Sequence, residues 1–133
     1  MIKGIGVDVV HVHRLEHWIK VPGLLERYFH PHELETARSR GHGMAVSLAA
    51  RFAAKEAFGK ALGTGLKDIV LKDIMVVNRH NGQPEIEVFG TALAALQKYG
   101  ANKIHLSLTH EHDNAIAMIV LEQVDDDVNR QKS

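Results

Sequence analysis

The most informative stretch of the chain is residues 44–62, which read MAVSLAARFAAKEAFGKAL. This stretch holds four charged residues, no proline and a single glycine, Gly59. A segment with so few polar positions predicts a long helix that is apolar on most sides and therefore buried. The residues Gly63-Thr64-Gly65 follow at once, and glycine directly after a helix favours a C-terminal cap.

Shorter elements are expected on both sides of this helix. Residues 104–110 alternate strictly between apolar and polar side chains, which predicts a half-buried strand. Asn81-Gly82 predicts a hairpin turn in which both residues have positive φ angles. We expect strands over residues 2–10, 69–78, 84–89, 104–110 and 114–122, and further helices over residues 14–20, 24–29, 31–39 and 90–99. Together these elements predict an α+β fold with a mainly antiparallel sheet packed with one long buried helix.

Length and composition limit the class of protein. The 133 residues predict one domain over residues 1–123 and a polar, frayed tail over residues 124–133. Sixteen Lys and Arg balance sixteen Asp and Glu, whereas a general nucleic-acid binder usually carries a basic surplus. No apolar run is long enough to span a membrane. The absence of cysteine excludes disulfides, thiolate zinc sites and a cysteine nucleophile. We therefore expect a cytoplasmic protein that binds neither nucleic acid nor membrane.

Asp8 is a carboxylate inside an otherwise apolar strand. Strand periodicity places Asp8 on the same face as Gly4 and Gly6. Two glycines beside one carboxylate leave room for another backbone or a ligand to approach closely. The alternative is that Asp8 ends the strand or caps the next helix.

Glu56 lies in an apolar stripe of the long helix, with Lys60 one turn further on. A carboxylate in such a stripe is desolvated unless a cation pairs with it. One interpretation is an ion pair between Glu56 and Lys60. The other is that Glu56 faces a metal ion and Lys60 faces a phosphate. Arg51 and Lys55 likewise form either a solvated edge or a contact with an anionic ligand or partner.

Histidines occur in three His-x-His pairs, which are His11/His13, His30/His32 and His110/His112. On a strand, two such histidines point to the same face and can share a zinc ion. The alternative is that these histidines lie on the surface with no metal.

Three segments taken together resemble one family. They are residues 4–10 (GIGVDVV) followed by Arg14, residues 51–65 (RFAAKEAFGKALGTG) and residues 107–110 (SLTH). They resemble the holo-acyl-carrier-protein synthases, the small phosphopantetheinyl transferases, over nearly the whole chain except its tail. The resemblance implies transfer of the 4′-phosphopantetheine arm of coenzyme A to a serine of apo acyl carrier protein. It also implies release of adenosine 3′,5′-bisphosphate and a homotrimer with its sites at the subunit interfaces.

The resemblance also implies roles for individual residues. Asp8 and Glu56 match the metal ligands of the family, and Mg²⁺, or equally Mn²⁺, suits two carboxylates that are completed by phosphate oxygens and water. The other matched positions are Lys60 at the coenzyme A phosphates, Gly63, Thr64 and Gly65 beside the nucleotide, Thr109 and His110 near the coenzyme, and Arg14 at the acidic carrier protein. Either Glu56 or His110 is the proton acceptor for the serine.

Two other functions are compatible with the same residues. A metal-dependent phosphohydrolase would use Asp8, Glu56, His110 and His112 to act on coenzyme A or a nucleotide without a protein acceptor. A non-catalytic trimeric binding module would bind coenzyme A or the carrier protein and form no product.

Overall fold

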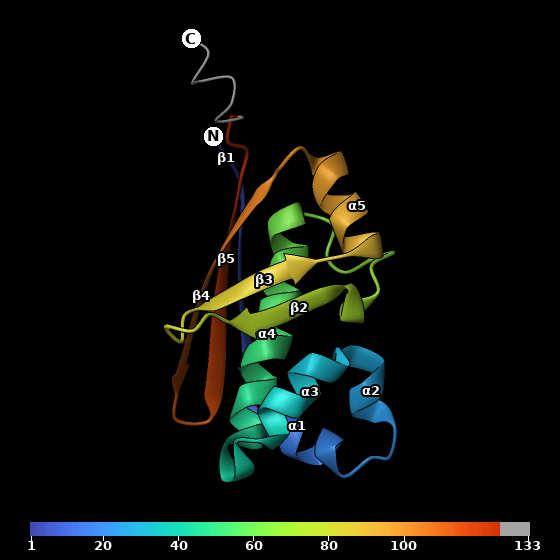
Figure 1. Ribbon diagram of the computed structural model, residues 1–133, viewed down its shortest axis with the longest axis vertical. Helices are drawn as coiled ribbons and strands as arrows, with labels where there is room; N and C mark the ends of the chain where they lie inside the picture. Colours follow the sequence, from blue (N-terminus) through green and yellow to red (C-terminus); the bar gives the residue numbers. More distant parts are fainter. Residues whose placement is uncertain (126–133) are drawn as a thin grey trace.

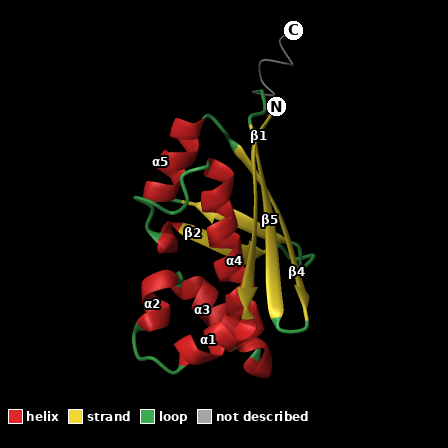
Figure 2. Ribbon diagram, turned by 180° about the vertical axis from the view of Figure 1, so that it is seen from behind, coloured by secondary structure: helices red, strands yellow, loops and turns green. Residues whose placement is uncertain are grey.

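The computed structural model describes residues 1–125 as a sheet with helices on one face. The sheet is antiparallel, with the order β1 (Ile2–His11), β5 (Asn114–Glu122), β4 (Lys103–Glu111). Helix α4 (Met44–Leu62) packs along this sheet and extends through the middle of the molecule (Figures 1 and 2). The predicted bounds of the long helix and the predicted α+β class are both confirmed.

Helix α4 lies unusually close to β1 because both partners present small residues. Ala53, Ala57 and Ala61 of the helix are buried. A Cβ atom on Gly6 would stand 2.1 Å from the carbonyl oxygen of Ala57, and one on Gly4 would stand 2.1 Å from that of Ala61. The space beside the two glycines is therefore filled by the backbone of α4.

The second sheet is a hairpin of β2 (Ile74–Asn78) and β3 (Pro84–Val88), which crosses α4 in Figure 1. The prediction of a strand over residues 69–78 is wrong for its first part, because the strand begins at Ile74 after a single 3₁₀ turn, Leu71–Asp73. The carboxylate of Asp73 accepts hydrogen bonds from the backbone N–H and the hydroxyl of Thr91, at 2.8 and 2.6 Å. These bonds hold Asp73 at the start of α5 (Gly90–Tyr99).

The hairpin turn differs from its prediction in one residue. Gly82 has a φ of +87°, whereas Asn81 does not adopt a positive φ. Asn81 instead accepts a hydrogen bond from the N–H of Gln83 through its side-chain oxygen, at 3.0 Å. The expected positive φ at both positions is therefore wrong for Asn81, because a side-chain bond stabilises the turn.

Three short helices pack together at the N-terminal end of α4: α1 (Val12–Ile19), α2 (Leu24–Tyr28) and α3 (Pro31–Arg38) (Figure 1). Helix α3 begins where the sequence predicts. The ring Nδ1 of His30 accepts from the N–H of His32, and Glu33 accepts from the N–H of His30, both at 3.0 Å. This reciprocal capping fixes the start of α3.

A fully buried ion pair joins α3, α4 and β2. The Nζ of Lys55 donates to Glu33 at 2.8 Å, and it also donates to the carbonyl oxygens of Leu71, at 2.9 Å, and Ile74. The other carboxylate oxygen of Glu33 accepts from the N–H of Val76 at 3.0 Å. Burial lowers the pKa of Lys55, and Glu33 opposes that effect. Lys55 is therefore an internal structural residue, and neither predicted role for it is correct.

The face of the three-stranded sheet turned away from α4 is apolar on β1 and β5, whereas β4 presents His105, Ser107 and Thr109 there. Ile5, Val7 and Val9 of β1 are 54–60% exposed, and Met118, the register partner of Val7 on β5, is 45% exposed. We call these four residues the open sheet face. Residues 1–125 contain no helix long and apolar enough to cross a membrane.

Candidate active site

Three predicted site residues meet where β1 crosses the second half of α4. Asp8 comes from β1, and Glu56 and Lys60 lie one turn apart on α4, so that they share a helix face. The Nζ of Lys60 donates to the carboxylate of Asp8 at 2.6 Å. Within the described part of the chain Lys60 therefore pairs with Asp8 and not with Glu56. Asp8 neither ends its strand nor caps α1, since β1 continues to His11.

The electrostatics of this cluster depend on two nearby carboxylates. Burial raises the pKa of Glu56, and the negative charge of Asp8 raises it further, while Arg14 and Lys60 act in the opposite direction. The hydrogen bond to Asp8 raises the pKa of Lys60. Two carboxylates that repel each other favour either a proton or a shared cation.

Arg14 reaches the cluster from α1. Its guanidinium carbon lies 5.0 Å from the ring centroid of Trp18 and 5.2 Å from that of Phe52. Phe52 precedes Glu56 by one turn of α4. The structure therefore brings Arg14 to the same end of the site as Glu56, as its influence on the pKa of Glu56 also indicates.

The residues Gly63, Thr64 and Gly65, which we call the glycine loop, begin three residues after Lys60. Gly63, with a φ of +81°, ends α4, and the N–H of Gly65 donates to the carbonyl oxygen of Gly59 at 3.0 Å. A Cβ atom on Gly59 would stand 2.7 Å from the carbonyl carbon of Gly65. The loop therefore folds back onto α4 because Gly59 has no side chain.

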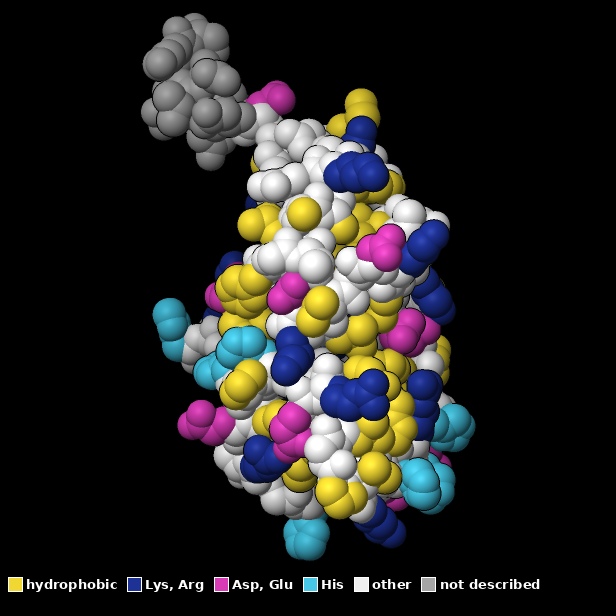
Figure 3. Space-filling view, turned by 90° about the vertical axis from the view of Figure 1, so that its right-hand side faces the viewer, with side chains coloured by type: hydrophobic (Ala, Val, Ile, Leu, Met, Phe, Trp, Pro, Cys, Tyr) yellow, Lys and Arg dark blue, Asp and Glu magenta, His cyan; other side chains and the backbone are white. Residues whose placement is uncertain are grey.

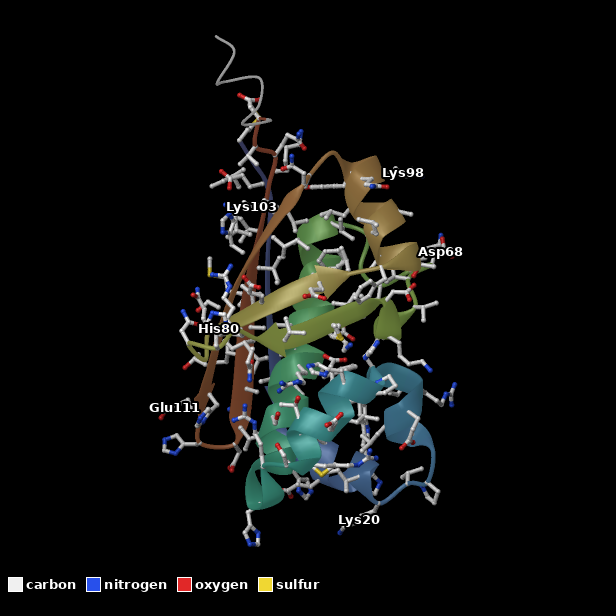
Figure 4. All side chains as sticks on the ribbon, in the orientation of Figure 1. Lys20, Asp68, His80, Lys98, Lys103 and Glu111 are labelled. Carbon is white, nitrogen blue, oxygen red and sulfur yellow. The ribbon has the colours of Figure 1, made fainter. Side chains whose placement is uncertain are left out.

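A surface cavity of about 580 Å³ lies between this loop and α5. Its lining includes Leu62, Thr64, Ile69, Lys98 and Tyr99. Figure 4 shows Lys98 on α5 and Asp68 on the loop that faces it. Helical geometry directs Leu62 and Lys60 to nearly opposite sides of α4, so the cavity is separate from the Asp8 cluster.

Thr109 and His110 are not part of the same cluster within one chain. Asp8 pairs with Ala117 of β5, and Ala117 pairs with Leu108 of β4, so a whole strand separates Asp8 from the end of β4. Two strand spacings amount to about 10 Å. Strand alternation places Thr109 on the sheet face opposite to Asp8. Both Thr109 and His110 are exposed.

Arg51, for which the sequence left two alternatives open, is buried on α4. It is only 4% exposed, and its Nη1 donates to the hydroxyl of Ser47 at 2.6 Å. Its Nε and Nη2 have no hydrogen-bond partner among residues 1–125. Burial lowers the pKa of Arg51. A buried guanidinium with unsatisfied N–H groups is costly, so this position favours an additional anion or acceptor.

The available metal ligands fit a divalent cation that prefers oxygen ligands. Within residues 1–125 no group of three or more His, Cys, Asp or Glu side chains is placed to hold a metal, so the histidine pairs there lack a third ligand. Asp8 and Glu56 provide two carboxylates. Mg²⁺ often takes one or two carboxylates and completes its shell with phosphate oxygens and water. The donor set therefore fits Mg²⁺ or Mn²⁺ bound together with phosphate oxygens.

Charged side chains are mixed over the face that contains α2 and α5. Figure 3 shows Lys and Arg side chains there interspersed with Asp and Glu. A binding site for an acidic partner on this neutral chain must therefore be a local one.

The chain is similar to proteins of one known family. The family model of the 4′-phosphopantetheinyl transferase superfamily matches residues 4–119. A holo-acyl-carrier-protein synthase of Treponema denticola is 57% identical over 122 residues, which cover 92% of this chain and 99% of the relative. The enzyme of that name from Treponema pallidum is 45% identical over 92% of this chain and 97% of its own.

Solved structures agree with these matches. The holo-acyl-carrier-protein synthase of Bacillus anthracis in complex with CoA (3′,5′-ADP) superposes with a TM-score of 0.78 at 33% identity, over 93% of this chain and 99% of that one. The synthase of Neisseria meningitidis gives a TM-score of 0.81 at 36% identity, over 92% and 100%.

Proposed function

The chain belongs to the 4′-phosphopantetheinyl transferase superfamily, among the holo-acyl-carrier-protein synthases, and on this premise we propose how its residues carry out the transfer. The family resemblance seen in the sequence is confirmed. The proposed reaction moves the 4′-phosphopantetheine group of coenzyme A to a serine of apo acyl carrier protein and releases adenosine 3′,5′-bisphosphate. The observation that supports it best is the meeting of Asp8, Glu56 and Lys60.

Asp8 and Glu56 would hold Mg²⁺ or Mn²⁺. The ion would neutralise negative charge on the pyrophosphate of coenzyme A. The raised pKa of Glu56 supports this assignment, because a carboxylate that is buried beside a second carboxylate is stabilised by a neighbouring cation.

Lys60 would orient the phosphates. The side chain of Lys60 is 55% exposed, so its amino group can turn from Asp8 toward a bound phosphate. The glycine loop supplies exposed backbone three residues after Lys60. Phosphoryl transfer depends mainly on such positioning and on charge, and the nucleophile is the serine of the partner protein.

Glu56 or His110 would accept the serine proton. Glu56 has the raised pKa that suits a base, and imidazole is the side chain that most often acts as a general base in enzymes. His110→Ala separates the two assignments. If His110 is the base, kcat falls by at least about 100-fold and its dependence on pH changes. If Glu56 is the base, His110→Ala changes the KM for coenzyme A instead.

A second copy of this chain would cover the open sheet face. Thr109 pairs with Ile116, which pairs with Val9, so Thr109 lies on the same sheet face as Val7 and Val9. A copy seated there would contact Thr109. The separation of Asp8 from His110 within one chain supports a site that a neighbouring chain completes. This arrangement supports a homotrimer whose sites lie between subunits.

Light scattering of the Val7→Lys variant tests the assembly. We expect a smaller mass, because a lysine ammonium would be desolvated in the contact, and a proportionate loss of transfer. Co-expression of an Asp8→Asn chain with a His110→Ala chain tests the shared site. Recovered activity supports it, and no recovery from a mixed oligomer contradicts it.

Intact mass of apo acyl carrier protein, incubated with this protein, coenzyme A and Mg²⁺, tests the reaction itself. The expected result is a mass gain of one phosphopantetheine arm that EDTA abolishes, with adenosine 3′,5′-bisphosphate formed in equal amount. Asp8→Asn should remove the gain, whereas Glu35→Gln, an exposed carboxylate on α3, should not. Loss of coenzyme A without carrier modification would support the phosphohydrolase, and binding without either product would support the binding module.

A further inference from the structure

We propose that Trp18 is a positioning residue, whose indole holds the guanidinium of Arg14 in a fixed place where it receives a carboxylate of the carrier protein. This inference rests on the proposed function, because it concerns how the carrier protein is recognised. The resemblance to the family implies a role for Arg14 only. The role of the aromatic side chains around Arg14 follows from their geometry in this chain.

Arg14 stands against two aromatic rings at once. Its guanidinium carbon is 5.0 Å from the ring centroid of Trp18 and 5.2 Å from that of Phe52. The rings of Trp18 and Phe52 are themselves in an edge-to-face contact, with centroids 4.9 Å apart and planes at 81°. Both separations of Arg14 lie within the range in which a cation is attracted to an aromatic face.

The aromatic rings are anchored in the core. Phe52 is 4% exposed and belongs to α4, while Tyr28 of α2 packs on Trp18 with a centroid separation of 5.3 Å. We call Trp18, Tyr28 and Phe52 the aromatic cluster. Because Phe52 and Glu56 share α4, this cluster fixes Arg14 relative to the helix that carries Glu56.

Arg14 keeps its hydrogen-bond donors available. Its side chain is exposed, and among residues 1–125 it forms no ion pair with an acidic side chain. A guanidinium held over aromatic rings keeps its N–H groups for a carboxylate, because the rings take none of its hydrogen bonds. This stacking over the rings orders the side chain before binding, which reduces the entropy lost when the carrier docks.

A second arginine uses the same cluster. The guanidinium carbon of Arg27 lies 5.9 Å from the ring centroid of Tyr28. Figure 4 shows Lys20 at the same end of the molecule, beyond α1. The cluster thus contacts two arginines on a chain whose net charge is zero. Two arginines held by one aromatic cluster match an acidic partner.

The free protein allows a first test that needs no substrate. The chain has a single tryptophan, so its intrinsic emission reports on Trp18 alone. Arg14→Ala should shift the wavelength or the yield of this emission. Arg27→Ala is the matched control, since Arg27 contacts Tyr28, and it should change the emission much less. Unchanged emission in Arg14→Ala would overturn the stacking, whatever reaction the protein catalyses.

A double-mutant cycle tests the functional claim. Trp18→Leu should lower kcat/KM for the carrier protein by about 2- to 10-fold, while the KM for coenzyme A stays unchanged. Trp18→Phe, which keeps an aromatic face, should recover most of that loss. In an Arg14→Ala background, Trp18→Leu should have no further effect, because Trp18 acts through Arg14.

Two outcomes of the cycle overturn the proposal. Fully additive losses in the double variant would show that Trp18 contacts the carrier directly or only packs the core. An equal loss for Trp18→Phe and Trp18→Leu would show that the aromatic face is irrelevant. Failure of the wild-type protein to modify any carrier would instead contradict the proposed function, and the emission test would still decide the stacking.

Discussion

Adding one methyl group at Gly6 should separate the two elements that carry the site. A Cβ atom there would stand 2.1 Å from the carbonyl oxygen of Ala57 and 2.6 Å from the backbone nitrogen of Ala61. Favourable contact between non-bonded atoms begins at about 3.5 Å, so β1 and α4 would have to part by about 1 Å. Both obstructing atoms are backbone, so no side chain can rotate away to relieve the contact.

The size of the effect follows from this geometry. Overpacking a core usually costs about 1–3 kcal/mol, and a clash with backbone on a regular helix belongs at the upper end, so we expect Gly6→Ala to cost about 3 kcal/mol. Asp8 lies two residues further along β1 and would move away from Glu56 and Lys60 with the strand. A misplacement of this size costs on the order of 100-fold in rate.

Urea denaturation followed by circular dichroism measures the first effect, and the rate of carrier modification measures the second. Gly43→Ala is the matched control, because its Cβ atom would lie 3.7 Å from the nearest side-chain atom, Cβ of Arg40, and Gly43 has a φ of −85°. We expect that variant to stay within about 0.5 kcal/mol of wild type. A Gly6→Ala protein of wild-type stability and turnover would refute the close contact of β1 with α4.

Three further changes test other parts of the molecule. Folding raises the pKa of Glu56, so wild type loses stability as the pH rises through the pKa of Glu56 in the folded protein. Glu56→Gln should therefore be inactive, more stable than wild type at pH 7, and equally stable below about pH 4. Thermal unfolding at both pH values checks this, and equal stability at pH 7 contradicts it. Lys55→Met should lower the free energy of unfolding by about 3–5 kcal/mol, because it leaves Glu33 buried and unpaired. Adding Glu33→Gln should recover part of that loss. A Lys55→Met protein as stable as wild type in urea would disprove the pairing. Gly59→Ala should displace the glycine loop at Gly65 and raise the KM for coenzyme A more than the KM for the carrier, whereas an unchanged KM for coenzyme A would place the nucleotide elsewhere.

Local sequence was sufficient for most of the secondary structure. The bounds of α4 and α5, and the start of α3, agree with prediction because apolar periodicity, capping residues and terminal glycines act within a few residues of each other. The prediction of a strand over residues 69–78 failed at its start. The reason is that Asp73 bonds to Thr91, a contact 18 residues away in the chain.

The family resemblance also indicated which residues gather around Asp8, but it could not determine their partners. Lys60 was compatible with Glu56 at one helical turn, yet it bonds to Asp8, 52 residues away. Lys55 and Arg51 had the same two alternatives in the sequence. The structure buries Lys55 against Glu33 and leaves two nitrogens of Arg51 without a partner in residues 1–125.

The sequence by itself therefore determined most of the elements and, through its resemblance, the family. Only the tertiary structure decided which charges pair, which are buried, and that Thr109 and His110 stand one strand away from Asp8. The physical reason is one of range. Helix and turn preferences are set by near neighbours, whereas desolvation and ion pairing depend on what the folded chain brings into contact from distant positions.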